Sequence, residues 1–471
     1  MKLVKSLLLG SAAGIAAVAG AQAADLPSRK AAPVEYVRVC SAYGAGFFYI
    51  PGTDTCLRVG GRVRAEYAVG TRFGDYQDAY GTRARGRLNI DARTATAYGT
   101  LRTFFRYELT NNTGLYNSGA ITPFNTGAVV PGSVRGAAPA ASSSALVDLA
   151  FVQFGPITAG RAQSFFDFYA NDYNFASTRT SDTRLNLLAY TATFGSGFSA
   201  TVSLEDRVSG TNNRELPGVT FTPSLLGGAV FGTAVNQGQD YPDLIGSLRV
   251  DQGWGSAQLS GAIGQRKYAV ALPSVAVQSP VDGDELVWAI QGGVRINLPM
   301  LAAGDNIVLQ AAYADGSLGY IGWYPGTFGV GRLGGLTLAD ATLNTITGSV
   351  DNSSGFSLVA ALKHFWTPQL RTEITASYSQ LKLKYIDAAS FGAFARSLDP
   401  KEYNIAANLI WSPVSGLDIG VEVLYTHLDV RSPVQEAINV GTGAAASVRN
   451  GLLGIKNDDA WAGRLRIQRD F

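Results

Sequence analysis

The sequence has only two histidines, two cysteines and two methionines among 471 residues. So few imidazole and thiolate groups leave almost no ligands for a metal site of that type, and we expect neither a metal nor a cofactor. An excess of one charge is also missing, because 38 Lys and Arg side chains nearly balance 36 Asp and Glu side chains. Such a balance disfavours a nucleic-acid binder, which needs positive charge to attract phosphates.

Long apolar runs are absent beyond the first residues of the chain. Two lysines precede an uncharged apolar stretch at residues 7–19, and the small residues Ala21 and Ala23 follow it. This arrangement predicts a signal peptide at residues 1–23. A membrane anchor is disfavoured, because the stretch is shorter than the ~20 residues that span a bilayer. The rest of the chain has no apolar run long enough for a transmembrane helix, which leaves an exported soluble protein or a β-barrel.

Alternation of polar and apolar side chains favours the barrel. It occurs over residues 57–69, 83–93, 101–109 and 402–411. A transmembrane strand needs this pattern over about 10 residues, because one face meets lipid and the other meets water. Tyr403 and Trp411 share one face at a spacing close to that of two aromatic girdles, about 20 Å of membrane height. A soluble β-sandwich also alternates, so the alternation alone leaves both folds open.

The lengths of the connections decide between the two folds. We predict sixteen strands, at 57–69, 82–93, 97–109, 146–154, 157–162, 184–194, 198–207, 242–251, 254–266, 285–297, 305–315, 356–366, 369–384, 401–411, 417–429 and 459–471. Short segments rich in Gly, Pro and Ser alternate with long ones between these strands. Outer-membrane barrels have this alternation, whereas compact soluble domains rarely tolerate loops beyond ~15 residues. The predicted fold class is therefore all-β, a transmembrane antiparallel β-barrel of about sixteen strands over residues 57–471.

Three stretches carry a resemblance to a known family: CLRVGGRVRAEY at 56–67, ARGRLNIDART at 84–94 and GRAQSFFDF at 160–168. They resemble the general diffusion porins of alphaproteobacteria, the group found in rhizobia and brucellae, and the likeness covers essentially the whole mature chain. It implies a homotrimer in the bacterial outer membrane, in contact with lipid and lipopolysaccharide. Each barrel would be a water-filled pore for passive diffusion of small hydrophilic solutes and ions. The third loop, here Gln163 to Asp182, would fold inward as a constriction.

Arginines are concentrated on the inward faces of the first three predicted strands: Arg58, Arg62, Arg64, Arg83, Arg85, Arg87, Arg102 and Arg106. They need water, carboxylates or both, because an unpaired charge in a low-dielectric interior costs several kcal/mol. Candidate partners are Glu66, Asp91 and Glu108 on the strands and Asp167, Asp172 and Asp182 on the loop. The pairs could simply hold the loop in place, or they could set a transverse field across a pore, and both interpretations can hold together.

Single residues near the two ends of the chain carry two further predictions. Cys40 and Cys56 suggest a disulfide in an exported protein, tying the N-terminal segment 24–56 to the first strand, with two free thiols as the alternative. Phe471 ends the alternating run of the last predicted strand. It resembles the signal by which the outer-membrane barrel assembly machinery recognises its clients.

Two other functions compete with a general pore. A barrel enzyme would need a Ser/His or carboxylate cluster, and neither His364 nor His427 lies near a plausible nucleophile in the sequence, so we expect no enzyme. A substrate-selective channel for sugars or anions is the nearer alternative. A sugar channel would carry a file of luminal aromatics, yet Phe104 is the only large one on the inward faces of the first three strands. The GxGxxG pattern at 329–334 lacks a following helix and is interpreted as coincidence.

Overall fold

The computed structural model describes residues 38–71, 78–118, 141–209, 214–216, 218–223, 229–236, 238–270, 282–324, 338–344, 349–383, 398–436 and 453–471. The predicted signal peptide at 1–23 and the glycine-rich pattern at 329–334 lie outside the described residues. Two compact units divide the chain, residues 1–56 and 57–471. No helix in the described part of the chain is both long and apolar enough to cross a membrane.

The described part of the first unit is a small disulfide-bonded segment. It contains the 3-10 helix η1 (Ser41–Tyr43) and the short strand β1 (Phe48–Tyr49). Cys40 and Cys56 form a disulfide, with their Cα atoms 5.9 Å apart, and both are buried against Phe47. The predicted disulfide is thereby confirmed.

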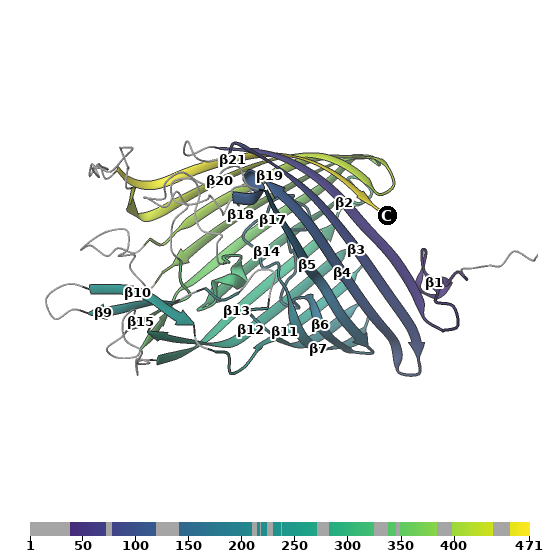
Figure 1. Cartoon of the computed structure of the whole chain (residues 1–471), viewed down its shortest axis with the longest axis horizontal. Coiled ribbons are helices and arrows are strands. Elements are labelled where there is room, and N and C mark those ends of the chain that lie inside the picture. The colour runs from purple at the N-terminus through teal and green to yellow at the C-terminus, as the bar shows by residue number, and fades with distance from the viewer. Residues whose placement is uncertain are drawn as a thin grey trace, which may run out of the picture. The chain divides into compact units, whose positions relative to one another are not determined.

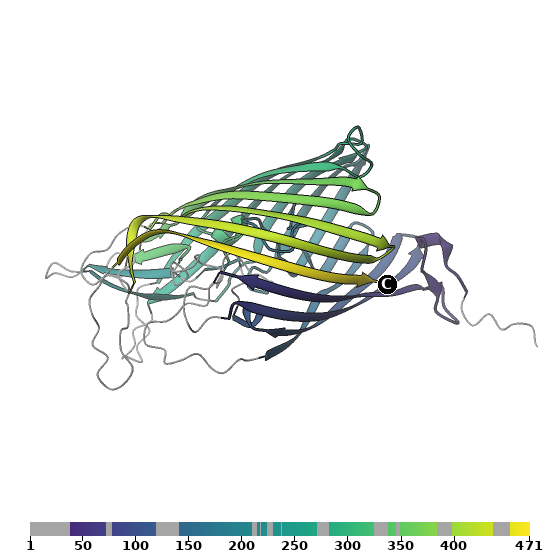
Figure 2. The same ribbon diagram turned by 90° about the horizontal axis from the view of Figure 1, so that it is seen from above.

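The second unit is a closed antiparallel barrel of sixteen strands. In chain order the strands are β2 (Cys56–Gly70), β3 (Tyr80–Thr96), β4 (Gly99–Thr113), β5 (Ala141–Phe154), β6 (Ile157–Gln163), β7 (Arg184–Gly195), β8 (Phe198–Glu205), β11 (Asp243–Gln252), β12 (Gly255–Val270), β13 (Asp282–Asn297), β14 (Asn306–Asp315), β17 (Ser354–Thr367), β18 (Leu370–Lys382), β19 (Lys401–Val414), β20 (Leu417–Glu436) and β21 (Leu453–Asp470). The ring closes where β21 pairs with β2, from Arg62 opposite Asp470 to Gly70 opposite Ala462. Both views show β21 beside β2 (Figures 1 and 2).

Short and long connections alternate around the ring. The short ones are 97–98, 155–156, 196–197, 253–254, 298–305, 368–369 and 415–416, and the long ones are 71–79, 114–140, 164–183, 206–242, 271–281, 316–353, 383–400 and 437–452. Some of the short connections need glycine, because another residue would clash there. A Cβ on Gly197, whose φ is +80°, would stand 1.9 Å from the carbonyl oxygen of Asp251. The strand count and the connection pattern predicted from the sequence are confirmed.

The long connections contain short elements that the sequence pattern does not predict. They are α2 (Leu115–Ser118), β9 (Gly218–Pro223), β10 (Ala229–Asn236), η2 (Leu318–Ile321), β15 (Ala341–Asn344) and β16 (Val350–Asn352). β9 pairs with β10 and also, in parallel, with β15. The pairing of β9 with β15 links two connections that are far apart in the sequence, so no local period predicts it.

The strands present apolar side chains outward and polar side chains inward. On β19, Tyr403, Ile405, Leu409 and Trp411 are 44–49% exposed. The residues between them, including Glu402, Asn404 and Asn408, are buried. The outward face suits lipid and the inward face suits a hydrated lumen. This polarity makes the inward side chains and the connections packed among them the candidate functional site.

Candidate functional site

The predicted arginines follow the inward faces of β2, β3 and β4. Arg58 is exposed near the start of β2, and Arg62 pairs with Asp470 at 2.6 Å. We use the name arginine wall for the inward-facing Arg64, Arg83, Arg85, Arg87, Arg93, Arg102, Arg106, Arg184, Arg464 and Arg466. These residues lie on β2, β3, β4, β7 and β21. Arg93, Arg184, Arg464 and Arg466 were not among the predicted site residues.

Carboxylates of neighbouring strands pair with the arginine wall. The ion pairs join Glu66 to Arg83 (3.6 Å), Arg464 (3.9 Å) and Arg466 (2.7 Å), Asp91 to Arg93 (2.7 Å) and Arg102 (2.9 Å), and Glu108 to Arg85 (3.1 Å) and Arg87 (2.7 Å). The three strand carboxylates proposed as partners from the sequence thus do contact arginines. The alternation explains these ion pairs, because polar side chains on the inward face of one strand lie opposite those of the adjacent strand.

Asp148 is a fourth carboxylate of this wall, and sequence reasoning missed it. On β5 it is the extra residue of a β-bulge, because Arg106 pairs with Leu149 and Tyr107 pairs with Val147. The bulge buries Asp148 on the inward side, 3.4 Å from Arg106 and 3.4 Å from Arg184. The available signal was the break in alternation at this point, where an acid stands directly beside leucine.

The connection between β6 and β7 packs inside the barrel. We call residues 164–183 the inserted loop. At its start, the side-chain amide nitrogens of Gln258 and Gln291 donate to the carbonyl oxygen of Phe166 at 3.3 Å and 2.7 Å. Further along, the Tyr169 amide donates to Oε1 of Gln310 at 3.0 Å. These glutamines lie on β12, β13 and β14, so the loop follows the wall that faces away from β2–β4.

The far end of the inserted loop is held by a carboxylate and two arginines. The amides of Phe175 and Ala176 donate to the two oxygens of Glu422 on β20, at 2.6 Å and 2.9 Å. The carbonyl oxygen of Phe175 accepts hydrogen bonds from Arg464 and Arg466. The loop therefore reaches from β6 to β21, where it contacts the β21 arginines of the arginine wall.

The three predicted loop acids have separate environments. Asp167 is buried and lies 3.2 Å from Arg214, a residue of the connection after β8. Asp172 is exposed and lies 2.6 Å from Arg295 on β13. Asp182 is partly buried, 3.5 Å from Arg184. The described ion pairs of these acids are with Arg214, Arg295 and Arg184, and their suggested pairing with the arginines of β2–β4 stays a prediction.

Parts of two other connections pack beside the inserted loop. Leu216, Leu318, Tyr320 and Trp323 are buried together with Phe166 of the loop, against inward-facing side chains of β11, β12, β13, β14, β18 and β20. The rings of Phe166 and Tyr320 meet edge to face at 4.7 Å. We call these segments, residues 214–216, 317–324 and 338–343, the packed connections. They cover the inward wall on the side away from β2–β4.

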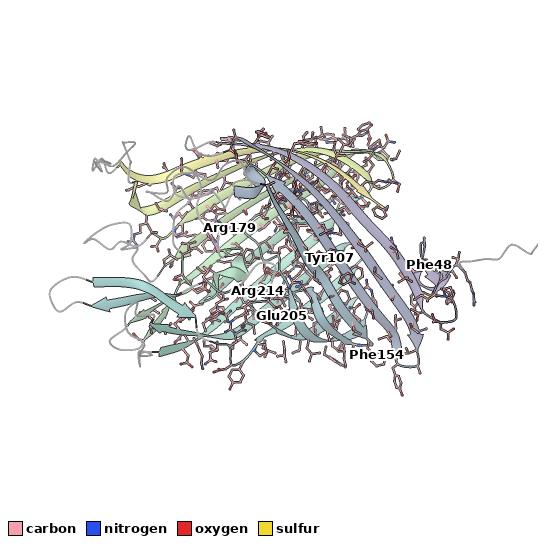
Figure 3. The ribbon with its side chains drawn as sticks, viewed as in Figure 1. Phe48, Tyr107, Phe154, Arg179, Glu205 and Arg214 are labelled. Carbon is pink, nitrogen blue, oxygen red and sulfur yellow. A yellow bond between two sulfur atoms is a disulfide. The ribbon has the colours of Figure 1, made fainter. Side chains whose placement is uncertain are left out.

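Buried ion pairs join the inserted loop to the packed connections and the wall. Arg179 donates to Glu402 on β19 at 2.6 Å and 2.9 Å, and its guanidinium stacks on Trp323 at 3.4 Å. Arg214 lies 2.9 Å from Glu205, the last residue of β8. Figure 3 labels Arg179, Arg214 and Glu205, which come from the loop, the packed connections and the barrel. These cations were missed, because nothing local to their sequences marks them as buried.

Glycines of the wall and of the packed connections leave room for the inserted loop. A Cβ on Gly293 of β13 would stand 2.2 Å from a ring carbon of Phe168. A Cβ on Gly420 of β20 would stand 2.8 Å from the ring of Phe175. These strand positions cannot carry a side chain without moving the loop.

Other predicted site residues have clear locations. Phe471 exchanges backbone hydrogen bonds with Gly61 at 2.9 Å and 3.0 Å, next to the closing strand pair. Its role in assembly stays a prediction. His364 contacts Asp305, and His427 contacts Asp459. No group of three or more potential metal ligands occurs among the described side chains.

Comparisons with known proteins agree on one family. The profile of the Porin subfamily matches residues 25–463. The chain is 32% identical to Porin Omp2b of Brucella suis biovar 1 (strain 1330) over 344 residues, which is 66% of this chain and 85% of the relative. It is 36% identical to Porin Omp2b of Brucella neotomae over 261 residues, 54% of this chain and 64% of the relative.

One solved structure supports the fold. The outer membrane channel DcaP of Acinetobacter baumannii superposes with a TM-score of 0.56 at 15% identity, covering 90% of this chain and 99% of that chain. At this identity the likeness concerns the fold alone.

Proposed function

Because this chain belongs to the porin subfamily and is a diffusion channel of the bacterial outer membrane, we propose that its pore runs between the arginine wall and the inserted loop. Small hydrophilic solutes and ions would cross this passage passively. The inserted loop acts as the constriction, and the arginines of the wall on β2, β3 and β4 form the side of the passage opposite it. A charged, hydrated wall excludes apolar solutes, since they cannot replace the water that the guanidinium groups hold.

This proposal rests on the hydrogen bonds that attach the inserted loop to the barrel strands. Its amides at Phe175 and Ala176 are bound to Glu422, and its start is bound to Gln258 and Gln291. Contacts at both ends hold the loop inside the lumen. The arginine wall keeps partial exposure, with 22% for the side chain of Arg85 and 23% for that of Arg106. A narrow aqueous passage along the arginines is the arrangement that these values favour.

Liposome swelling tests the proposal. Vesicles that contain the full-length protein should swell in neutral sugars, at rates that fall smoothly as the sugar becomes larger. Vesicles without protein are the control. If protein-containing vesicles do not swell in any of the sugars, the proposed pore is wrong.

A sugar-selective channel remains the second candidate, and one observation favours it. Phe104 and Phe151 stack at 5.4 Å on the inward face of β4 and β5, between Arg102 and Arg106. Sugar rings bind to aromatic faces of this kind. Conductance in planar bilayers with added maltodextrins separates the candidates, because a saturable block indicates a selective site and an unsaturable small decrease indicates general diffusion.

We further propose that the chain assembles as a homotrimer. Apolar side chains cover the outward face of β2–β5, including Val63 at 58% and Leu109 at 54% exposure. A part of such a face can be buried against a second copy as well as against lipid. Light scattering of the purified protein in mild detergent should give the mass of three chains, and a monodisperse monomer would contradict the proposal.

A further inference from the structure

The arginine wall contains far more cations than anions. Four carboxylates, Glu66, Asp91, Glu108 and Asp148, are shared by nine arginines within 4.0 Å: Arg83, Arg464 and Arg466; Arg93 and Arg102; Arg85 and Arg87; Arg106 and Arg184. Arg64 is a tenth cation, and its described side-chain partner is the neutral Gln468, at 2.7 Å and 2.9 Å. Asp182 near Arg184 and the buried Glu422 near Arg464 and Arg466 offset only part of this excess.

The carboxylates lie beneath the arginines. Side-chain exposure is 0% for Glu66, 5% for Asp148, 6% for Glu108 and 10% for Asp91. The arginines bound to them are 7% to 27% exposed. A solute at this wall therefore touches guanidinium groups, whereas the acids act on it only through their field. The exposed chemistry of the wall is cationic.

Hydrogen-bond donors on this wall also outnumber acceptors. A guanidinium group has five N–H donors, while a carboxylate offers roughly four acceptor sites. Neutral partners such as Asn89 and Asn112 accept from Arg106 and Arg83 and take up a further part of the donors. The donors that remain must bind water or a solute. Phosphate and carboxylate groups match the guanidinium fork in geometry and charge.

The opposite side of the passage does not carry enough exposed negative charge to balance the arginines. Asp167 of the inserted loop is buried against Arg214, so it adds no exposed negative charge. Asp172 is exposed, but Arg295 lies 2.6 Å away and is 31% exposed itself. Lys363 of β17, 23% exposed, lies above the ring of Tyr173 and is paired with the buried Glu373 at 3.3 Å, so this pair adds no exposed negative charge.

We propose that the arginine wall is a binding strip for anionic solutes that carry phosphate or carboxylate groups, and that the channel conducts anions in preference to cations. The inference rests on the proposed position of the pore and specifies its substrate class. Arg64 has Arg62, Arg85 and Arg466 around it, together with Glu66, so several guanidinium groups lie within reach of one anion. An anion can therefore pass from one guanidinium group to the next without losing its partners.

Arg64 is the most informative residue to change. No carboxylate in the described part of the chain lies within 4.0 Å of its guanidinium, so Arg64→Gln leaves no buried acid without its cation. Glutamine can still hydrogen-bond to Gln468. Arg64→Lys keeps the charge, and Lys401→Gln removes an exposed cation from the outward side of β19 as a matched control.

The experiment measures the reversal potential of the full-length protein in planar bilayers under a KCl gradient near 0.1 M. We expect chloride preference in the wild type, a shift toward equal permeabilities in Arg64→Gln, and wild-type values in Arg64→Lys and Lys401→Gln. The shift should shrink at 1 M salt, because the screening length falls from ~10 Å to ~3 Å. Heat-modifiable migration on gels verifies that each variant is folded.

Inorganic phosphate provides the binding assay. It should reduce the chloride conductance of the wild type saturably, and Arg64→Gln should need a higher phosphate concentration for the same reduction. Cation preference or no preference in the wild type overturns the inference, as does an unchanged reversal potential in folded Arg64→Gln. A complete lack of conductance would instead contradict the proposed pore, so the two failures are distinguishable.

Discussion

At the scale of single residues, buried arginines fix the segments that pack inside the lumen. Arg179 and Arg214 are two of them: neither has exposed side-chain area, and each lies against one or more carboxylates. A buried ion pair contributes little net stability compared with apolar residues, but removing one partner leaves a buried charge uncompensated. These residues therefore fix the positions of the inserted loop and the packed connections more than they stabilise the barrel.

Arg179→Ala should strongly loosen the inserted loop. It leaves Glu402 buried without its guanidinium partner, which costs about 3–5 kcal/mol. The temperature at which the folded form disappears on gels should fall, and current noise in bilayers should rise. Arg431→Ala is the control, because the Arg431–Asp399 pair is exposed on the arginine side and such pairs contribute up to about 1 kcal/mol. Equal effects of the two substitutions would contradict the anchoring role of Arg179.

Asp172→Asn and Asp167→Asn should differ in their effects. Asp172 is the exposed carboxylate of the loop, so its neutralisation should move the reversal potential further toward anions at 0.1 M salt. Asp167→Asn removes a buried partner of Arg214 and should lower thermal stability with little change in selectivity. The pair of variants is measured in the same KCl gradient. A selectivity change confined to Asp167→Asn would mean that the ion path passes elsewhere.

Residue pairs were predictable where both partners belong to the regular strand pattern. Glu108 meets Arg87 because their positions are directly opposite on β3 and β4. Asp167, in contrast, meets Arg214 through a connection 47 positions along the chain, whose path no periodicity encodes. The roles of charged residues in irregular segments therefore need the folded structure.

At the scale of elements, the strands were predictable and the packing of the connections was not. Alternation of side chains is a local consequence of having lipid on one face and water on the other, so it marks the sixteen barrel strands in the sequence. Tyr320 and Trp323 sit in a segment without period, and their burial depends on partners such as Leu381 of β18. An apolar residue in a long loop does not reveal whether it faces water or fills a lumen.

Gly293→Val should displace the inserted loop. The added side chain would begin 2.2 Å from the Phe168 ring, and overpacking of this kind costs about 1–3 kcal/mol. Single-channel recordings should show altered conductance and more frequent fluctuations. Gly292→Val is the matched control, because a Cβ at this neighbouring position meets nothing within 4 Å. The same conductance for both variants would show that Phe168 does not hold the loop.

At the scale of the whole molecule, the lumen is shared by connections that come from different parts of the ring. The inserted loop follows β6, and the packed connections follow β8 and β14. Asp340 links the connection after β8 to the connection after β14, since its carboxylate oxygens accept hydrogen bonds from the amides of Leu216 and Leu318, both at 2.8 Å. One carboxyl group thereby couples the positions of two segments that are about a hundred residues apart.

Asp340 should make the packing of the lumen sensitive to pH. It lies in a connection outside the membrane-spanning strands, and burial raises its pKa to about 7, although the amide hydrogen bonds and Arg266 act in the opposite direction. The unfolded value is about 3.9, so the folded form holds the proton more tightly. This contribution to stability is complete at low pH and is lost as the pH rises through about 7, with an upper limit on the order of 4 kcal/mol.

Conductance noise should therefore increase between pH 5 and pH 8, because the charged Asp340 loosens the packed connections. It should fall back to its original level when the pH is lowered again. Asp340→Asn can accept only one of the two amide hydrogen bonds, so its noise should be higher at every pH, but it cannot ionise, so its noise should not change over this range. Asp351→Asn removes an exposed carboxylate of the same connection and should retain the wild-type pH dependence. Neither histidine contacts the packed connections in the described interactions, since His364 meets Asp305 and His427 meets Asp459. If Asp340→Asn keeps the full pH dependence, the coupling of the two connections does not depend on ionisation of this residue, and the pH response must originate elsewhere in the barrel.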